Sequence, residues 1–338
     1  MNILKQQILK ELKKNLNEFV SGEELSNKLN VSRTAVWKNI KSLQAEGYKI
    51  DSSTKKGYSL LSGGDILNKY EIADGLKTNY IGKDIVYLAT VDSTNNYAKK
   101  IVAENEKEGA IIVAGVQTKG RGRLGRHWSS GKHKGVWMSV ILKPDIPPER
   151  IQIITLATAV AVVKAIKDLY GIETGIKWPN DIILDSKKVC GILTEMNCEA
   201  DRINFIVVGI GLNVCMEKAD FPPGYREKAT SLLIHSNRNK DKLMQKFVRS
   251  EIIKRILVEL EDAYNKLNAN ESAGIIKEWK NFSVTLEHEV KVISRNSEFS
   301  CIAKDITEDG KLVVECPDGS VKYISSGEVS VRNLMGYT

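Results

Sequence analysis

The residues of this chain that are best suited to chemistry lie in one short segment, Gly120-Arg121-Gly122-Arg123-Leu124-Gly125-Arg126. It follows an apolar, strand-like run over 110–116, and the next such run begins near Gly135. Glycines allow backbone conformations that other residues avoid, and each guanidinium carries a fixed positive charge. A long stretch without periodicity inside a compact domain is usually functional or disordered. The segment predicts a loop suited to a negatively charged ligand, with a nucleic-acid-binding loop as the open alternative.

A lysine on a predicted strand, Lys188, is a second candidate for anion binding. Apolar residues flank it, and a half-buried ammonium is costly unless an anion pairs with it. The alternative is a lysine whose stem packs while its head reaches water, which is common. Upstream, the run from Gly175 to Leu184 predicts a strand and a tight Pro-Asn-Asp turn, followed by a hairpin through Asp185-Ser186.

Two further segments place polar or glycine residues where a ligand could approach. Asp92-Ser93-Thr94-Asn95 precedes a helical pattern, and its side chains either cap that helix or present hydroxyl and amide groups to a ligand. Gly209-Ile210-Gly211-Leu212-Asn213 belongs to a strand in which the two glycines indicate close approach of a ligand or backbone. The spacing is not the GxGxxG of a dinucleotide-binding fold.

The first 64 residues predict a winged helix-turn-helix. Apolar residues at helical spacing run from Ile3 to Leu16, Ser21 opens a capping box, and Ser32 caps a third helix that Gly47 ends. The stretch 48–61 then alternates as a two-stranded wing. The residues predicted to face DNA are Ser21, Ser32, Arg33, Thr34, Lys38, Lys41, Lys55 and Lys56.

The charge of this N-terminal module supports a polyanionic partner. Residues 1–64 carry 11 Lys and Arg against 6 Asp and Glu, so they hold most of the net charge of +8. Trp37 is expected in the core of the module rather than at a base edge. A three-helix module that contacts only protein is the alternative. Ser62-Gly63-Gly64 is interpreted as a hinge.

The rest of the chain indicates a cytoplasmic protein with a small β module at its end. Helical periodicity extends from Lys240 to Asn268, and short strands from about Thr285 are joined by turns at Asp309-Gly310 and Asp318-Gly319. The longest mostly apolar run, 153–163, falls short of the ~20 residues that cross a bilayer. No signal peptide is recognised. Five scattered cysteines without CxxC spacing predict neither disulfides nor a zinc site.

In their order along the chain, these motifs resemble those of the biotin protein ligases. The run from Gly120 to Arg126 is similar to the family signature GRGRxGR, and the companion motifs match residues 92–95, 177–181, Lys188 and 209–213. With its DNA-binding head, the chain resembles the repressor branch of that family, the biotin operon repressors. The resemblance covers almost the whole chain. Val189-Cys190 departs conservatively from the family's usual Leu-Ala.

The resemblance implies an AMP-forming enzyme that uses biotin and ATP with Mg²⁺. It would form biotinyl-5′-adenylate and transfer biotin to a lysine of a biotin carboxyl carrier protein. It would also bind operator DNA as a ligand-promoted homodimer and repress transcription, with the adenylate as corepressor. The residues that the resemblance assigns to biotin and nucleotide are Ser93, Thr94, Asn95, Gln117, Gly120, Arg121, Gly122, Arg123, Arg126, Trp128, Lys188 and Asn213. Of these, Trp128 would pack on the adenine side and Asn213 would lie near the nucleotide.

The chemistry of adenylation fits this assignment. Two unit negative charges ~4 Å apart repel by ~1 kcal/mol in water and ~4 kcal/mol at an effective dielectric of ~20. Arg121, Arg123 and Lys188, with magnesium carried by ATP, would offset the repulsion between a carboxylate and a triphosphate. The acceptor lysine must then lose a proton, because its free pKa is ~10.4. Asp181 is the candidate general base or ammonium anchor, with turn capping as the alternative. The predicted catalytic residues are therefore Lys188, Arg123 and Asp181.

The predicted fold class is α+β with three domains. A winged helix-turn-helix and hinge occupy 1–64. A mixed α/β ligase domain that resembles class II synthetase-like folds occupies 65–284, and an SH3-like barrel occupies 285–338. A lipoate or octanoate ligase or transferase on the same catalytic fold is one alternative function. A repressor that senses ligand without catalysis is the other. No membrane association is expected.

Overall fold

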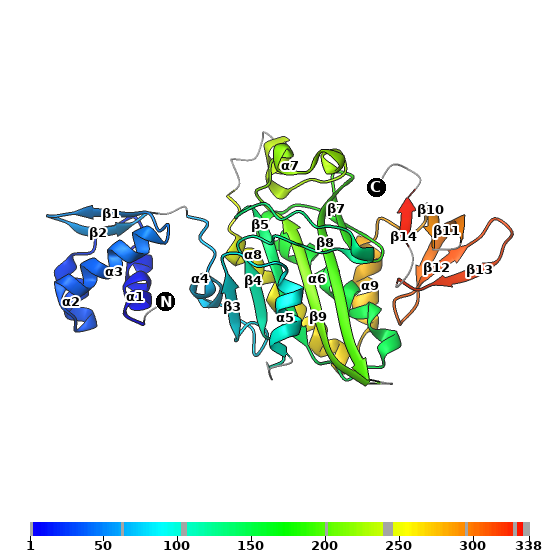
Figure 1. Ribbon diagram of the computed structural model, residues 1–338, viewed down its shortest axis with the longest axis horizontal. Coiled ribbons are helices and arrows are strands. Elements are labelled where there is room, and N and C mark those ends of the chain that lie inside the picture. Colours follow the sequence, from blue (N-terminus) through cyan, green and yellow to red (C-terminus); the bar gives the residue numbers. More distant parts are fainter. Residues whose placement is uncertain are drawn as a thin grey trace. The chain divides into compact units, whose positions relative to one another are not determined.

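The computed structural model describes residues 3–61, 64–102, 107–199, 202–238, 246–294, 297–326 and 330–333. The chain divides into two compact units, Met1–Asp74 and Gly75–Thr338 (Figure 1). Ser62 and Gly63 of the predicted hinge lie outside the described residues, as does the beginning of the helical pattern predicted from Lys240. The division between the units falls after Asp74, whereas the sequence pattern placed a hinge at Ser62–Gly64.

The first unit has the element order predicted for a winged helix-turn-helix. Its elements are α1 (Ile3–Lys14), α2 (Gly22–Leu29), α3 (Arg33–Ala45), the antiparallel strands β1 (Ile50–Ser53) and β2 (Gly57–Leu60), and α4 (Lys69–Ala73). The Ser21 side chain accepts a hydrogen bond from the Glu24 N–H at 3.0 Å, and Ser32 accepts one from Ala35 at 3.2 Å. Each serine therefore caps its helix as the sequence predicted.

Helix α4 is held to this unit by a partly buried polar network. Lys13 Nζ lies 2.8 Å from Glu71 Oε2 and 2.8 Å from Asp74 Oδ2. The Tyr48 hydroxyl donates to Glu71 Oε1 at 2.7 Å and accepts from Asn68 Nδ2 at 3.2 Å. Burial, reinforced by the Glu71 charge, raises the pKa of Tyr48, so it stays a neutral donor. The network explains why the first compact unit continues to Asp74.

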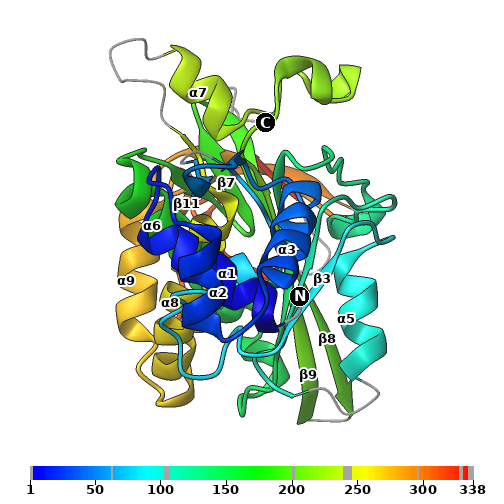
Figure 2. The same ribbon diagram turned by 90° about the vertical axis from the view of Figure 1, so that its left-hand side faces the viewer.

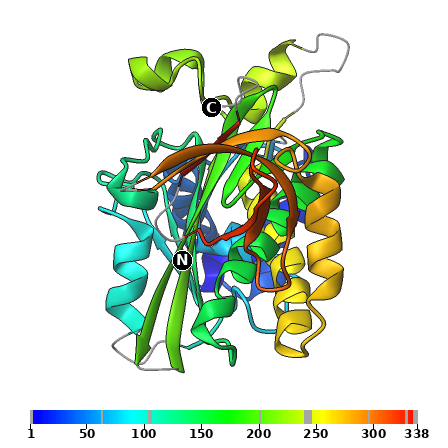
Figure 3. The same cartoon turned by 90° about the vertical axis from the view of Figure 1, so that its right-hand side faces the viewer.

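The second unit is built on a seven-stranded sheet with the order β3-β4-β5-β9-β8-β7-β6. Only β3 and β4 run parallel, and the other neighbours are antiparallel. Helix α5 (Thr94–Val102) lies on one face of the sheet, and α6 (Gln152–Tyr170), α8 (Arg249–Asn268) and α9 (Ala273–Phe282) lie on the other (Figures 2 and 3). The strands are β3 (Ile85–Leu88), β4 (Ile111–Ala114), β5 (Gly135–Leu142), β6 (Gly175–Lys177), β7 (Asp181–Leu184), β8 (Lys187–Glu199) and β9 (Arg202–Asn213).

Helix α6 contains the longest mostly apolar run of the sequence and is the most buried of the helices that pack against the sheet. Every residue from Ile153 to Val163 is buried. The helix ends at Gly171, whose φ of 64° is left-handed. Among the described residues, no helix is both long and apolar enough to cross a membrane.

The C-terminal part forms its own five-stranded antiparallel sheet, drawn in orange to red in Figure 3. Its order is β13-β12-β11-β10-β14, and Gly310 and Gly319 take the left-handed conformation at the two predicted turns. Trp178 Nε1 donates to the Gly310 carbonyl at 3.1 Å, which ties this sheet to the β6–β7 turn. The strands are β10 (Glu289–Ile293), β11 (Glu298–Ile306), β12 (Leu312–Glu315), β13 (Val321–Ile324) and β14 (Ser330–Asn333).

The remaining elements are short and connect the larger ones. They are α7 (Leu232–Arg238) and the 3₁₀ turns η1 (Arg123–Gly125), η2 (Pro148–Arg150), η3 (Lys218–Asp220) and η4 (Pro223–Tyr225). All five cysteines are free thiols.

Candidate functional site

A cavity of about 790 Å³ in the second unit gathers the predicted ligand-binding residues. It is lined by the start of α5, the loop 117–129, the β6–β7 turn, strands β8 and β9, the segment 221–229 and Met138 of β5. Lys291 of β10 adds one side chain from the C-terminal sheet. Of the residues assigned to biotin, nucleotide or catalysis from the sequence, Gly120 alone does not line the cavity. Gly120 belongs to the loop but is buried, and a Cβ on it would lie 2.5 Å from the Trp128 carbonyl oxygen.

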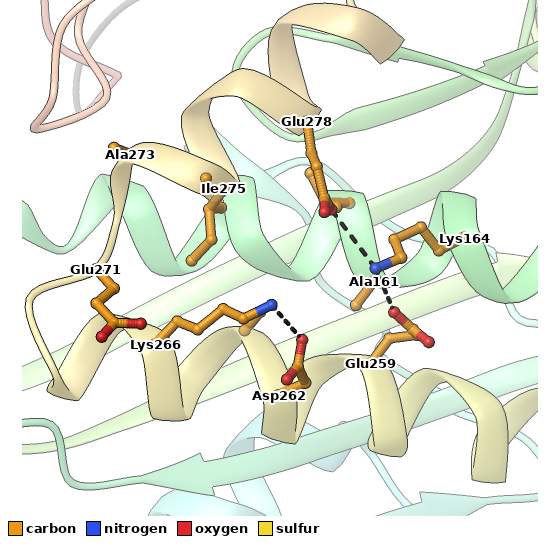
Figure 4. Close-up of a pocket in the computed structure, with 12 residues that line it drawn as sticks. Ala161, Lys164, Glu259, Asp262, Lys266, Glu271, Ala273, Ile275 and Glu278 are labelled. Atoms are coloured by element: carbon orange, nitrogen blue, oxygen red, sulfur yellow. Dashed lines mark hydrogen bonds and ion pairs between the residues drawn. The ribbon is translucent and has the colours of Figure 1, made fainter.

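A second hollow, of about 420 Å³, lies between α6, α8 and α9 (Figure 4). Figure 4 shows Lys164 between Glu259 and Glu278, with Nζ–O distances of 2.7 and 3.6 Å. Lys266 pairs with Asp262 at 2.7 Å. These lysines are neutralised by neighbouring carboxylates, which is the arrangement of a helix-surface ion-pair network. The larger cavity, which combines cations with unsatisfied polar atoms, is therefore the candidate site.

Gly209 leaves room for a side chain of this chain rather than for a ligand. A Cβ at Gly209 would lie 2.3 Å from Asn95 Oδ1. Gly209 pairs with Ser139 on β5 and with Leu193 on β8, so the three residues form one cross-strand row beneath Asn95. The sequence predicted close approach of a ligand or backbone at this glycine, and the approaching group is instead the Asn95 side-chain amide.

The Asn95 amide is fixed by hydrogen bonds from both ends. Ser139 Oγ donates to Asn95 Oδ1 at 2.6 Å. Asn95 Nδ2 donates to the Leu193 carbonyl at 3.2 Å and to Glu195 Oε2 at 2.8 Å. Both N–H groups are thus used within the protein, and the remaining lone pair of Oδ1 is what Asn95 can offer to a ligand.

Thr94 and Gln117 join the start of α5 to the arginine-glycine loop. The Thr94 N–H donates to Gln117 Oε1 at 2.8 Å, and the Thr94 hydroxyl lies 3.1 Å from the same oxygen. Gln117 Nε2 donates to Ser130 Oγ at 3.1 Å. Ser93, Thr94 and Asn95 are each at most 3% exposed, so this end of the cavity is enclosed.

Gly211 makes room for Trp128 in the same way. A Cβ at Gly211 would lie 2.7 Å from atoms of the Trp128 indole, and one at Gly191 would lie 2.9 Å from it. Gly191, Gly211 and Trp137 form one cross-strand row, and Trp128 packs edge-on against Trp137 with ring centroids 6.4 Å apart. Gly191 and Gly211 therefore leave the space in which the Trp128 indole packs, and this indole forms one wall of the cavity.

Glu195 belongs to the site although the sequence analysis did not single it out. Its carboxylate lies 2.6 Å from Lys99 Nζ and 3.7 Å from Arg121 Nη2, in addition to its bond with Asn95. Burial alone would raise the pKa of Glu195, but hydrogen bonds from Lys99 and Asn95 outweigh burial and lower it. Gly191, Leu193 and Glu195 alternate on one face of β8, and this period of two was the signal that could have found it.

The arginine-glycine loop folds back on itself as a short turn. The Gly122 N–H donates to the Arg126 carbonyl at 2.8 Å, and the 3₁₀ turn η1 contains Leu124 at a left-handed φ of 56°. Arg121 Nη1 donates to Asn96 Oδ1 at 3.0 Å. The sequence predicted an aperiodic loop, and the structure adds backbone hydrogen bonds that fix the direction of its arginines.

Arg123 connects three parts of the second unit. Its Nη1 donates to Asn180 Oδ1 at 3.0 Å, and its Nη2 donates to the Ser326 carbonyl of the C-terminal sheet region. Asn180 Nδ2 in turn donates to the Ile192 carbonyl at 2.8 Å. Asn180 was part of a sequence motif but had no predicted role, and the structure shows that it positions Arg123.

Lys188 and Asp181 form an ion pair inside the cavity. Lys188 Nζ lies 2.6 Å from Asp181 Oδ1 and 5.3 Å from the centre of the Trp128 ring. Asp181 begins β7, and the register of β7 against β8 shifts between Ile182 and Ile183. The anion that a half-buried Lys188 requires is therefore supplied by Asp181.

Asn213 presents an acceptor to the cavity. It is 2% exposed, and its Nδ2 donates to the Thr230 carbonyl at 3.0 Å. Its Oδ1 is buried and has no hydrogen-bond partner among the described residues. Buried polar atoms are normally paired, so Oδ1 is suited to a ligand that brings an N–H or O–H donor.

The residues predicted to face DNA lie at the surface of the first unit. Arg33, Thr34, Lys38, Lys41, Lys55 and Lys56 are exposed. Arg33 Nη2 pairs with Glu23 at 2.5 Å, and Lys56 Nζ lies 5.7 Å from the centre of the Phe19 ring. The oxygens of Ser21 and Ser32 are engaged as helix caps, so only their hydroxyl hydrogens remain for a phosphate.

The prediction that Trp37 belongs to the core is wrong. The side chain is 49% exposed. The buried stripe of α3 consists of Val36, Ile40 and Leu43. Trp37 follows Val36 by one residue, which on a helix turns it well away from that stripe. Hydrophobicity alone suggested burial, and the helical period decides against it.

Comparison with known proteins identifies the family. The Biotin/lipoate A/B protein ligase family matches residues 87–213, an HTH domain matches residues 5–59, and the Biotin protein ligase C terminal domain matches residues 285–332. The bifunctional ligase/repressor BirA of Bacillus subtilis is 38% identical over 93% of this chain and 94% of its own length. The protein of the same name from Escherichia coli is 28% identical over 94% of each chain.

The solved structures agree. Biotin protein ligase from Aquifex aeolicus in complex with biotin and ATP has a TM-score of 0.63 and 28% sequence identity. The match covers 74% of this chain and 99% of the Aquifex aeolicus chain. Matching head, ligase and C-terminal regions occur here in one polypeptide. The chain therefore belongs to the family of the bifunctional ligase/repressor proteins, the biotin protein ligases that carry a helix-turn-helix domain.

Proposed function

We propose that this chain activates biotin with ATP as biotinyl-5′-adenylate and transfers it to a lysine of a biotin carboxyl carrier protein. The observation that carries the proposal is the meeting of Arg121, Arg123 and Lys188, from a loop and a separate strand, around one cavity. Both substrates are anions. Three cations gathered at one cavity lower the cost of bringing a carboxylate against a phosphate.

The two ends of the cavity suit the two halves of the adenylate. The end formed by Ser93, Thr94 and Asn95 is enclosed and uncharged, which suits the neutral ring system of biotin. Trp128 offers an aromatic wall on the other side, and Asn213 offers an acceptor for a nucleotide donor. Lys188 lies beside Trp128, so we assign it to the carboxylate and the α-phosphate.

Magnesium enters this proposal as the ion that ATP carries. Asp181 is the one carboxylate among the described residues that line the cavity. The described part of the chain contains no group of three His, Cys, Asp or Glu side chains that could hold a metal ion. This donor set fits Mg²⁺ bound chiefly through substrate phosphates and water, and the ion would supply further charge neutralisation at the phosphates.

The N-terminal unit is proposed to bind operator DNA, with the adenylate as corepressor and a ligand-promoted homodimer as the binding form. Its exposed basic helix and basic wing tip support this proposal. The proposed partners, ATP, carrier protein and DNA, support a cytoplasmic location. Sedimentation with and without biotin and ATP tests the dimer, and an unchanged monomer would remove that part of the proposal.

The ligase proposal is tested by exchange of labelled pyrophosphate into ATP. Exchange is expected to require biotin, and a carrier domain is then expected to become biotinylated at one lysine. Lipoate and octanoate are the matched controls, because both are carboxylates that the related transferases use. Exchange that depends on lipoate and not on biotin would replace the substrate assignment. Absence of exchange with every carboxylate would favour a repressor that senses ligand without catalysis.

Glu195 gives a prediction about the biotin end of the site. Glu195→Gln is expected to raise the KM for biotin by about tenfold with little change in kcat, because the charged acceptor that orients Asn95 and the ion pair with Arg121 are lost. A hydrogen bond to a charged group is worth about 1.5–3 kcal/mol. Steady-state pyrophosphate exchange measures both constants.

Glu199→Gln is the control, since Glu199 ends the same strand and is exposed. The pKa of Glu195 is lowered in the folded chain, so the stability it contributes is present above the ordinary carboxyl pKa of ~4.3 and is lost as the pH falls. When the free energy of unfolding is plotted against pH, Glu195→Gln should therefore show a smaller loss of stability at acid pH than the wild type. An unchanged KM for biotin in Glu195→Gln would show that the carboxylate does not position the site.

A further inference from the structure

Trp37 leaves its indole ring in solvent on the surface of α3. It is 49% exposed. Of the other four tryptophans, Trp137, Trp178 and Trp279 are at most 1% exposed, and the partly buried Trp128 lines the ligand cavity. A large aromatic ring on an outer helix face indicates a contact surface, since tryptophan combines a broad apolar ring with one N–H donor.

The neighbours of Trp37 on the helix are polar or cationic. Arg33 and Lys41 stand one turn before and one turn after it on the same side of α3. Thr34 and Lys38 flank it, and all four of these side chains are exposed. Lys38 and Lys41 form no ion pair within the described part of the chain. Arg33 is already paired with Glu23, so the positive charges that the first unit leaves available beside the indole are those of Lys38 and Lys41.

This combination favours a DNA duplex over a protein surface as the occupant. A duplex offers phosphates on both sides of a groove, and the floor of the major groove carries the apolar 5-methyl group of thymine. The ammonium groups of Lys38 and Lys41 match the phosphates, while the neutral ring beside them matches the base edge. The wing tip with Lys55 and Lys56 adds further positive charge on the same unit.

We propose that Trp37 is a specificity-determining residue of the DNA interface that contacts a thymine methyl in each operator half-site. This inference rests on the proposed repressor function. Because the indole is neutral, it releases no counterions, and its contribution is independent of salt. Lysines at phosphates behave in the opposite way, because each one adds to the salt dependence and little to sequence choice.

The experiment compares full-length Trp37→Ala with Lys38→Gln, using biotin and ATP throughout. The wild-type chain first selects duplexes from a randomised pool, and the affinities for the selected duplex and for a random duplex are then measured over a range of salt. Trp37→Ala is expected to lose about tenfold in the ratio of selected to random affinity, with an unchanged salt slope. Lys38→Gln is expected to weaken both duplexes equally and to lower the slope by about one.

Replacing individual thymines of the selected duplex by deoxyuridine removes only the methyl group. At one position in each half-site this change should weaken the wild type several-fold and leave Trp37→Ala unaffected. Trp37→Phe keeps an apolar ring and should retain most of the selectivity. Equal Tm values for the wild type, Trp37→Ala and Trp37→Phe would show that the fold is kept, as expected for a half-exposed side chain.

The outcomes distinguish failure of this inference from failure of the proposed repressor function on which it rests. If the wild type enriches a motif and Trp37→Ala enriches the same motif with the same affinity, the inference is overturned and the repressor function stands. Loss of ligand-promoted dimerisation in Trp37→Ala, with selectivity intact, would place the ring between two copies and also overturn it. If the wild type enriches no sequence at all, both the repressor proposal and the role of Trp37 are removed.

Discussion

Lys188→Gln is expected to lower the rate of biotin adenylation by about 10²–10³-fold, the loss typical of removing one group that stabilises developing charge. Lys188 Nζ lies 2.6 Å from Asp181 and beside the Trp128 ring, so its ammonium is held where carboxylate and phosphate would meet. Without it, Asp181 becomes an unbalanced negative charge in the cavity and repels both substrates. Single-turnover formation of the adenylate measures the effect directly.

Lys187→Gln is the matched control for this experiment. Lys187 precedes Lys188 on β8, and its ammonium lies 3.4 Å from Glu227 Oε2. It is not among the residues that line the cavity. Its replacement should leave adenylation within about twofold. Equal loss in the two variants would mean that general positive charge on β8 matters, and that the assignment of Lys188 to the reacting groups is wrong.

Asp181→Asn is expected to separate the two half-reactions. Adenylation should persist, because neutralising Asp181 frees the positive charge of Lys188 for the anionic substrates. Transfer to the carrier lysine should fall by about 10²–10⁴-fold, the usual contribution of a positioned base. The remaining transfer should rise with pH towards the acceptor's pKa of ~10.4, since solution must now remove the proton. Rapid-quench transfer from preformed adenylate measures this step.

Asp185→Asn is the control for the aspartate experiment. Asp185 lies in the β7–β8 hairpin turn and contacts His235 at 2.9 Å, outside the residues that line the cavity. Its loss should leave both half-reactions unchanged. Normal transfer by Asp181→Asn would reduce that carboxylate to a counter-charge for Lys188. Loss of both half-reactions would instead show that the ion pair holds the site together.

The sequence was informative wherever a local pattern had one physical cause. Ser21 and Ser32 predicted helix caps because only a short side chain with an acceptor can satisfy those N–H groups. The glycines of β9 predicted close approach, because a Cβ at Gly209 or Gly211 has no space. Spacing and residue type are sufficient in such cases, since the partner lies nearby or is backbone.

What the sequence could not predict depended on pairings between distant segments. The bond of Arg123 to the Ser326 carbonyl joins residues about 200 positions apart, and no local period reveals it. The same holds for Glu195 with Lys99 and Asn95, because these contacts require the register of β8 beneath α5. Trp37 shows a second kind of failure, in which apolar character outweighed the helical period.

The attachment of α4 to the first unit decides where this polypeptide can be cut or recombined. A fragment that ends at residue 64 would leave Lys13 and the Tyr48 hydroxyl without Glu71, the acceptor that now satisfies both. A fragment that ends after Asp74 keeps that acceptor. The peptide bond between Asp74 and Gly75 is therefore the point at which another head could be grafted onto this ligase.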